Sequence, residues 1–379
     1  MNPLIATLFV FALYTCTQLL YAAYNPWWRF ALLAIFIPFI YYRNSLLSTI
    51  SKLKSLQWQR FFLIIMIVLL CFRLIHFAAR YAKPTTHIED VAILNYDAVQ
   101  ELFRAHRNPY AGEFDPYPVD RSDGTIVHYP GYKYPPLQLV YYAPFMLLLG
   151  IKGVFVANLF CYLMLVFIIY ALLSRRGLPI HASLAAIAFL STDFLFTLSF
   201  NKGTNDLPGT LFAFLAFASA RSSSATTTSG IFLGLSLLMK QLPGGLLALI
   251  FLLKRQWHLL IVATLLFCIA ILPFLLFTDP YYFYRQVVEF VFVRPARETS
   301  WLLHLSPWWQ KLVQLLGIVT IATLALSKQT KKQLGVWGLA TLAITLFLLT
   351  SKMAPSHYFV WALPFTVMWF FEAPAPSKK

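Results

Sequence analysis

The chain has 379 residues, of which 59% are hydrophobic and only 12% are charged. Soluble globular proteins usually carry about a quarter charged residues, so this composition excludes an ordinary soluble enzyme. The mean hydropathy is +0.68, and the apolar residues form long runs instead of amphipathic stripes. The net charge of +16 does not indicate nucleic-acid binding, because the basic residues lie mostly in short loops between apolar runs. The sequence predicts an all-α, polytopic integral membrane protein.

The apolar runs predict about twelve transmembrane helices, since a span needs about 17 to 25 apolar residues. The runs lie near residues 4–23, 26–42, 61–79, 153–173, 179–199, 206–220, 229–240, 242–253, 258–277, 306–327, 334–351 and 355–371. Two neighbouring runs, 229–240 and 242–253, are short and could instead be one span that is broken at Pro243.

The distribution of basic residues predicts the orientation. If the N-terminus is cytoplasmic, fourteen Lys and Arg residues fall on the cytoplasmic side, with Glu372 as the only acid beside them. This positive-inside pattern requires that the apolar stretch 137–150 does not cross the bilayer. At fourteen residues the stretch is too short to span comfortably. We therefore expect it to form a helix at the outer interface, with both chain termini in the cytoplasm.

The segment from Arg80 to Pro136 is the long polar stretch of the chain, and it is predicted to face outward. It holds eight of the fourteen acidic residues: Glu89, Asp90, Asp97, Glu101, Glu113, Asp115, Asp120 and Asp123. A second outer loop covers about residues 278–307. Long loops on one face often carry the function, although most loop acids are merely solvated and the loop tyrosines could form a plain aromatic belt.

Other polar residues reach the same side in this topology. Asn205 and Asp206 have the pattern of a helix N-cap pair. Lys240 lies between two short apolar runs, where an ionisable residue indicates function, although a lysine there could also snorkel to the headgroups. His357 lies in the last outer loop and could be an ordinary interfacial residue.

The order of several motifs resembles the glycosyltransferase C superfamily, and in particular the family 87 polyprenol-phosphate-mannose-dependent mannosyltransferases. The motifs are Asp90-Val-Ala-Ile-Leu-Asn-Tyr-Asp97, Asn108-Pro109-Tyr110, Tyr134-Pro135-Pro136-Leu137, Asn205-Asp206, Lys240-Gln241-Leu242-Pro243 and His357-Tyr358. The resemblance implies a glycosyltransferase C-like transmembrane domain at 61–371 with its outer catalytic loop at 80–136. Two extra spans and a basic cytoplasmic loop precede it at 1–60, and a cytoplasmic tail follows at 372–379.

The resemblance also implies the reaction, which is inverting transfer of a hexose or pentose from a polyprenyl-phosphate sugar to a lipid or glycan acceptor. Mannose is the first choice of sugar. The site would face the outside or the periplasm from an inner, plasma membrane. The expected partners are the lipid-linked donor, the acceptor and membrane lipids, without nucleic acid, metal or cofactor.

Roles for single residues follow from the same resemblance. An acid after an early span serves as general base, and Asp90 fits this position best. Asp97 is the second choice, because the helix after Asp90 is about one residue longer than in the family. Cations should meet the charge on the leaving phosphate, and the candidates are Lys240, His357, Arg285 and Arg294. Substrate contacts are expected from Tyr110, Tyr134, Asn205, Asp206 and Gln241.

Two other classes of protein share this composition. A transporter or lipid-linked sugar flippase is also polytopic and basic, but it often shows repeated halves and charges near the midplane. Here no internal repeat is visible, and the charges gather on one face. A non-catalytic assembly protein would need no base beside cations.

Overall fold

The computed structural model describes most of the chain between residues 47 and 372. The described residues are 47–48, 50, 53, 56–83, 88, 90–111, 118–120, 126–128, 131–192, 195–196, 198–221, 226–276, 279–290, 300–351 and 356–372. The spans predicted at 4–23 and 26–42 lie outside the described residues, as do the side chains of Asp90 and His357.

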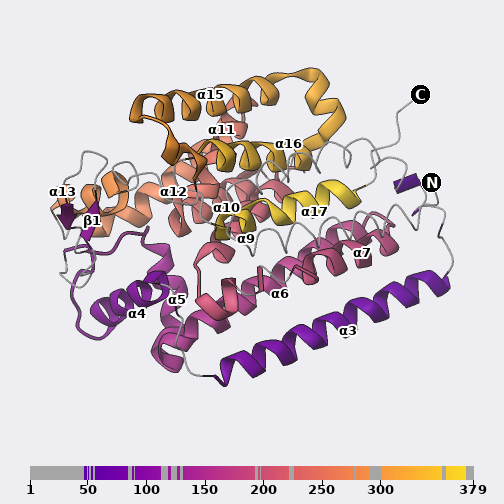
Figure 1. Cartoon of the computed structure of the whole chain (residues 1–379), viewed down its shortest axis with the longest axis horizontal. Coiled ribbons are helices and arrows are strands. Elements are labelled where there is room, and N and C mark those ends of the chain that lie inside the picture. The colour runs from indigo at the N-terminus through magenta and orange to yellow at the C-terminus, as the bar shows by residue number, and fades with distance from the viewer. Residues whose placement is uncertain are drawn as a thin grey trace.

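The described residues form a bundle of mostly apolar helices (Figure 1). The α-helices are α3 (Leu56–Tyr81), α4 (Asp90–Phe103), α5 (Leu137–Leu149), α6 (Gly153–Ser174), α7 (Pro179–Leu190), α9 (Asp206–Ser219), α10 (Thr226–Met239), α11 (Gln241–Leu253), α12 (Trp257–Leu276), α13 (Pro280–Phe283), α15 (Pro307–Leu326), α16 (Lys328–Thr350) and α17 (Leu363–Phe371). Shorter 3₁₀ or π turns are η1 (Gly150–Lys152), η2 (Leu198–Lys202), η4 (Tyr284–Glu289), η5 (Trp301–His304) and η6 (Ser356–Trp361). This architecture confirms the predicted all-α class.

One small feature was not predicted. Two short strands, β1 (Pro118–Asp120) and β2 (Ile126–His128), pair antiparallel in the loop that is predicted to face outward, with Val119 opposite Val127. Each strand has three residues, which is too short for a pattern of alternating polarity to be recognised in the sequence.

Four apolar segments of the described chain are long enough to cross a membrane, namely α3, the stretch Leu137–Ser174, α12 and α15. The stretch Leu137–Ser174 is not one straight helix, because α5 packs back against α6. The Tyr142 hydroxyl donates a hydrogen bond to Asn158 Oδ1 (2.9 Å), and a side chain at Gly153 would collide with the backbone of Phe145. In Figure 1, α5 runs steeply across the direction of α3 and α6, as expected of a helix that does not follow the spanning direction.

The structure interrupts one predicted span. Helix α7 ends at Leu190, whereas the sequence predicted a continuous span over 179–199. The hydroxyls of Ser191 and Thr192 bond back to carbonyls of the preceding turn, and such bonds compete with regular helix. Residues 195–196 are helical again, and the π turn η2 follows at Leu198–Lys202.

A buried arginine joins α3 to this interruption. Arg73 Nε donates to the carbonyl oxygen of Leu190 (2.8 Å), and its guanidinium lies 4.9 Å from the centre of the Phe196 ring. Arg73 is the buried residue of α3, whose other side chains are partly or fully exposed. A polar contact therefore fixes the position of the helix that leads toward α4.

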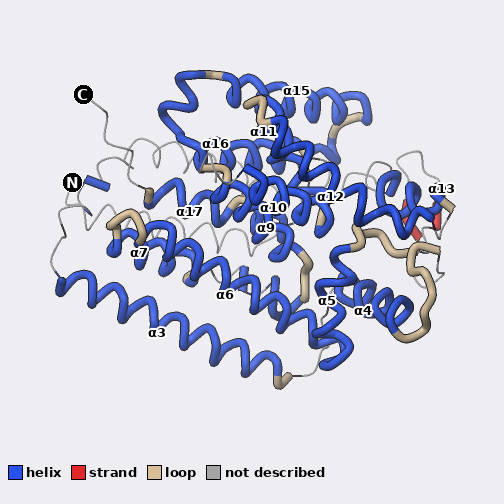
Figure 2. Tube along the Cα trace, turned by 180° about the vertical axis from the view of Figure 1, so that it is seen from behind, coloured by secondary structure: helices blue, strands red, loops and turns tan. Residues whose placement is uncertain are grey.

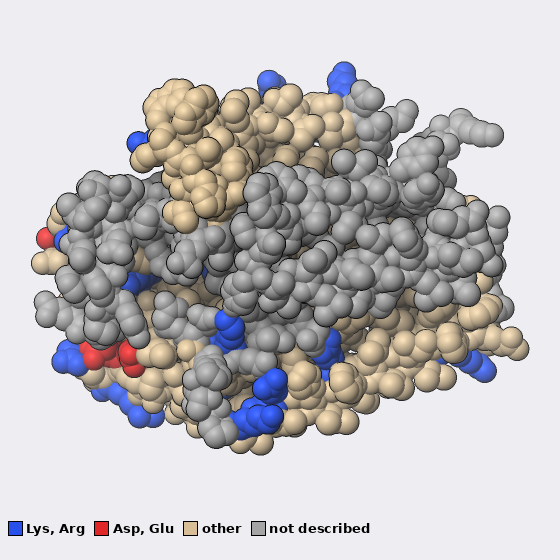
Figure 3. Space-filling model, in the orientation of Figure 1, with Lys and Arg blue, Asp and Glu red and all other residues tan. Residues whose placement is uncertain are grey.

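The two ends of the bundle differ in chemistry. Helix α4, strand β1 and helix α13 lie together at one end in Figure 1, and Figure 2 shows this end from behind. The acidic side chains visible in Figure 3 lie at the same end. At the other end, Glu372 after α17 contacts Arg176 and Arg221, which follow α6 and α9. These contacts place three predicted cytoplasmic residues together.

Candidate functional site

The central residue of the site is Lys240, which lies in the break between α10 and α11. Its backbone is extended (φ −159°, ψ 129°), and Leu242 is non-helical as well (φ −107°, ψ 138°), so the chain is kinked between α10 and the regular part of α11. The side chain is only 7% exposed. The structure thus confirms two separate helices at this position, and the break turns a lysine into the interior of the protein.

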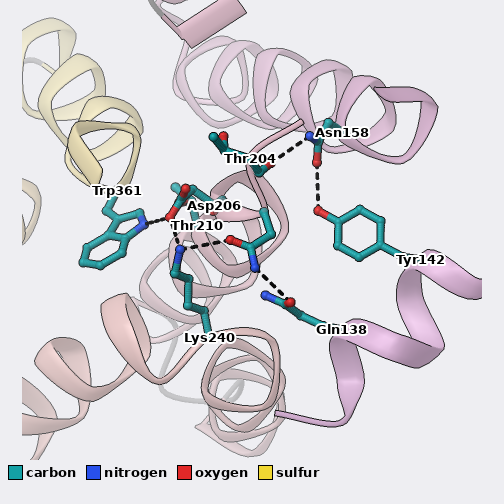
Figure 4. Close-up of polar contacts among 9 residues, drawn as sticks. Gln138, Tyr142, Asn158, Thr204, Asp206, Thr210, Lys240 and Trp361 are labelled. Carbon is teal, nitrogen blue, oxygen red and sulfur yellow. Dashed lines mark hydrogen bonds and ion pairs between the residues drawn. The ribbon is translucent and has the colours of Figure 1, made fainter. Parts of the chain in front are cut away.

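Lys240 forms a buried ion pair with Asp206, the first residue of α9. The ammonium Nζ lies 2.5 Å from Asp206 Oδ1 and 3.0 Å from Asn205 Oδ1 (Figure 4). Trp361 Nε1 donates to the same carboxylate oxygen of Asp206 over 2.8 Å. Asp206 is 1% exposed, so the pair is enclosed by protein and both charges are compensated at short range.

Two aromatic rings complete the surroundings of the lysine. Its ammonium lies 4.7 Å from the ring centre of Tyr358 and 5.6 Å from that of Trp361. The rings are stacked on each other at 4.1 Å. Such cation–π contacts stabilise a cation further, so Lys240 is held by α9 and by η6.

The N-cap pattern of Asn205 and Asp206 correctly marks the start of α9, but the expected capping hydrogen bond is absent. Asn205 occupies the N-cap position of α9, but its side chain makes no capping hydrogen bond. The amide oxygen accepts from Lys240, and the amide nitrogen donates to Gln138 Oε1 of α5 (2.9 Å). Both polar atoms of the Asn205 side chain are engaged in long-range hydrogen bonds, so neither caps the helix.

The hydrogen bonds continue from Gln138 into the outer loop. The hydroxyl of Tyr132 lies 3.1 Å from Gln138 Oε1 and 2.5 Å from Asn95 Oδ1 of α4. Burial raises the pKa of Tyr132 well above its usual value, so the phenol keeps its proton. Gln138 and Tyr132 are fully buried, and Asn95 is 1% exposed.

A second set of bonds holds the segment before α9, which includes the π turn η2. Asn158 of α6 donates from Nδ2 to the carbonyl oxygens of Ser199 (3.0 Å) and Thr204 (2.9 Å), while its Oδ1 accepts from Tyr142. Figure 4 shows Asn158 between Tyr142 and Thr204. One buried amide therefore ties α5, α6 and the segment that carries Asn205 and Asp206.

The structure places both candidate bases on α4. The motif implied a helix after Asp90, and α4 begins at Asp90 itself. Asp97 lies seven residues later, about two turns along the same face. The residues Ala92, Asn95 and Val99 form the buried face of α4, and Asp97 is half-buried. The side chain of Asp90 lies outside the described residues.

Gln241 and Arg285, two further predicted residues, contact other elements of the fold. Gln241 donates from Nε2 to the carbonyl oxygen of Val287 in η4 (3.0 Å). Arg285 of η4 lies 3.5 Å from Glu289 and near the Tyr281 ring. Arg294 and the His357 side chain lie outside the described residues.

The two loop tyrosines support the loop itself. Tyr110 is fully buried, and its hydroxyl donates to the carbonyl oxygen of Tyr134 (2.8 Å). Asn108 Oδ1 accepts from the backbone N–H of Tyr110 (3.0 Å), which makes the Asn-Pro-Tyr turn. The predicted substrate contact of Tyr110 would therefore need this packing to open.

Six residues of the site were not predicted from the sequence: Asn95, Tyr132, Lys133, Gln138, Asn158 and Trp361. Lys133 is 7% exposed, with its ammonium 4.8 Å from the Phe290 ring centre. A signal existed for Gln138 and Asn158, since each is an isolated amide within an apolar run. Trp361 carried no such signal, because an aromatic residue in a span is ordinary.

The part of the chain that the structure describes contains no group of three or more His, Cys, Asp or Glu side chains that could hold a metal ion. The chemistry available to the described site is that of a paired lysine and carboxylate, buried amides, phenols and an indole.

Comparisons with known proteins give a family and a fold. A family model of glycosyltransferase family 87 matches residues 132–352, which is more than half of the chain. The crystal structure of ArnT from Cupriavidus metallidurans, bound to undecaprenyl phosphate, is similar with a TM-score of 0.54 and 14% sequence identity. The match covers 80% of this chain and 59% of the ArnT chain, so this chain spans less than two thirds of that protein. No curated protein matches the chain.

Proposed function

This chain belongs to glycosyltransferase family 87, and we propose that it transfers a sugar from a polyprenyl-phosphate sugar to a lipid or glycan acceptor. The observation that carries the proposal is the buried Lys240–Asp206 junction at the end of the bundle where α4 brings Asp90 and Asp97. The ArnT structure, which shares the fold, holds undecaprenyl phosphate. A lipid phosphate of this kind is what a polyprenyl-phosphate donor releases.

The proposed reaction is a single displacement with Asp90 as general base. The acceptor hydroxyl oxygen attacks the anomeric carbon, the bond from that carbon to the phosphate oxygen breaks, and Asp90 takes the hydroxyl proton. The electron pair of the broken bond leaves with the polyprenyl phosphate. One base and one displacement invert the anomeric centre, unlike the two-step retaining scheme with two carboxylates. General base catalysis contributes about 10²- to 10⁴-fold.

Positive charge near the leaving phosphate would come from the outer cations. Lys240 is already paired with Asp206, so this pair contributes a fixed dipole and little net charge. We propose that Arg285, Arg294 and His357 supply the net charge, and the buried Lys133 lies close to η4 through its contact with Phe290. Preorganised charges of this type act where charge develops in the transition state.

The proposal also covers the substrate contacts, the sugar and the orientation in the membrane. Asn205, Asp206 and Gln241 would act by shaping the site from α9 and α11, and Tyr134 by lining the loop that Tyr110 supports. Mannose is the first choice for the sugar, as the motifs of the family imply. The site would face the outside or the periplasm from an inner, plasma membrane, because the basic Arg176 and Arg221 lie at the opposite end.

The test is donor turnover in proteoliposomes that contain the purified full chain and polyprenyl-phosphate mannose labelled in the sugar. Transfer releases polyprenyl phosphate and moves the label to an acceptor. A flippase would instead carry the labelled donor across the bilayer with its bond intact. Transport of intact donor without release of polyprenyl phosphate would overturn the proposal.

A further inference from the structure

The buried ion pair and the helix that carries the candidate bases are joined by a continuous series of close polar contacts between side chains. The series runs through Lys240, Asn205, Gln138, Tyr132 and Asn95. It passes from the α10–α11 break to the start of α9, then to α5, to the outer loop and finally to α4. We name these five residues the amide relay.

The relay has a fixed direction. A lysine ammonium can only donate, so Asn205 must turn its oxygen toward Lys240 and its nitrogen toward Gln138. Gln138 must therefore present its oxygen to Asn205, and the same oxygen faces the Tyr132 hydroxyl. That hydroxyl has a single proton for two acceptor oxygens, Gln138 Oε1 at 3.1 Å and Asn95 Oδ1 at 2.5 Å. The charge of Lys240 thus sets the orientation of amides that are far from it in sequence.

The relay residues are buried, which indicates that they position other groups and do not bind substrate themselves. Gln138 and Tyr132 are fully buried, and Asn95 and Asn205 are 1% exposed. Figure 4 shows Gln138 reaching from α5 toward the side of the site where Lys240 lies. A substrate could not touch these atoms without opening the contacts between α4, α5 and α9.

Stability alone does not account for the relay. The amide nitrogens of Asn95 and Gln138 are buried and have no hydrogen-bond acceptor among the residues the structure describes. An orphaned buried donor costs folding free energy, and apolar side chains of similar shape would avoid that cost. Local costs of this kind are typical of functional sites.

We infer that the amide relay holds α4 in register with the Lys240–Asp206 junction, so that Gln138, Tyr132 and Asn95 are positioning residues for the base on α4. This inference rests on the proposed function, because it needs a base on α4 that works on a donor near the junction. A misplacement of about 1 Å can lower a reaction rate about 10²-fold. Contacts that fix the position of α4 relative to the Lys240–Asp206 junction therefore affect the rate of transfer.

The test uses Tyr132→Phe, Gln138→Met and the double variant in the full chain. The matched control is Tyr141→Phe, which removes a tyrosine hydroxyl of α5 that bonds to the Ala157 carbonyl (2.7 Å) and to Cys161, outside the relay. Hydrogen exchange of the α4 amides and turnover of polyprenyl-phosphate mannose are measured for each variant.

We expect α4 amides to exchange about fivefold faster in both single variants, since a hydrogen bond contributes on the order of a factor of five to a local equilibrium. We expect kcat to fall about 10- to 10²-fold with the donor KM within about twofold. The double variant should lose no more than the worse single one, because the relay is already broken. The control should leave α4 exchange unchanged.

Unchanged α4 exchange in both single variants would overturn the inference. A raised donor KM with unchanged kcat would also overturn it, because the residues would then bind donor. Absence of transfer in the wild-type chain would count against the proposed function, while the exchange measurement would still decide whether the relay holds α4.

Discussion

Two ion-pair sites connect α9 to the C-terminal segment, one at each end of the bundle, and they differ in how their charges are compensated. At the outer site, Lys240 and Asp206 have side chains only 8% and 1% exposed, and Trp361 adds a hydrogen bond. At the inner site, Arg176 and Arg221 share the single carboxylate of Glu372, with arginine side chains 36% and 31% exposed.

The two sites have different roles. The inner arginines relate to the topology of the chain in the membrane, and the outer pair relates to the geometry of the candidate functional site. The inner site keeps an excess of positive charge, as expected of the end that is predicted to be cytoplasmic. Burial, and then the neighbouring Arg176, lower the pKa of Arg221 to about 10. The outer site is neutral, enclosed and connected to further polar groups, which is an arrangement that fixes geometry. The inner arginines need only stay at the membrane boundary.

The largest expected effect is a loss of stability when the outer ion pair is broken. Lys240→Met leaves the Asp206 carboxylate buried without its cation, and breaking a buried pair in this way typically costs about 3–5 kcal/mol. We expect a strongly lowered thermal unfolding midpoint of the purified protein in detergent. The matched control is the double variant Lys240→Met with Asp206→Asn, which should recover most of the loss. Wild-type stability of Lys240→Met alone would contradict the buried pair.

The next effect concerns catalysis at the same end. Asp90→Asn keeps the shape of the side chain and removes its basicity, so sugar transfer should fall by at least about 10²-fold while donor binding survives. Asp97→Asn should cost much less. Transfer and donor binding are measured for both purified variants. A loss in Asp97→Asn with full transfer by Asp90→Asn would move the base to Asp97, and full transfer by both would remove carboxylate catalysis from α4.

The smallest effect is expected at the inner site. Arg221→Met is the counterpart of Lys240→Met, but it leaves Arg176 beside Glu372. Partly exposed ion pairs contribute about 0–1 kcal/mol, so the unfolding midpoint should change little and transfer should be unaffected. If Arg221→Met were as damaging as Lys240→Met, the distinction between the two sites would fail.

The sequence predicted the features that depend on local pattern. The apolar runs predicted the positions of the described spans, and Pro243 with its flanking glycines indicated the break that places Lys240. The motifs predicted a short helix after Asp90 and a second helix from Leu137, and the structure has α4 from Asp90 and α5 from Leu137. The end of α7 at Leu190 was missed because hydroxyl back-bonding and Arg73 of another helix decide it.

The contacts that build the site could not be predicted, because they join residues that are far apart in sequence. Asn205 and Gln138 are 67 residues apart, and Trp361 and Asp206 are 155 residues apart. Their meeting depends on how the helices pack, and apolar runs of similar hydropathy do not specify partners. The pattern at Asn205 and Asp206 even favoured a local cap, which the longer-range contacts of Lys240 and Gln138 override.

The central claim is a one-step transfer that a single carboxylate on α4 assists. The most direct measurement is the anomeric configuration of the transferred sugar, determined by NMR after reaction of the purified protein with polyprenyl-phosphate mannose labelled at the anomeric carbon. We expect the configuration in the product to be opposite to that in the donor, because one displacement inverts the centre. Retention of the donor configuration would require a second nucleophile and would contradict a single base at Asp90.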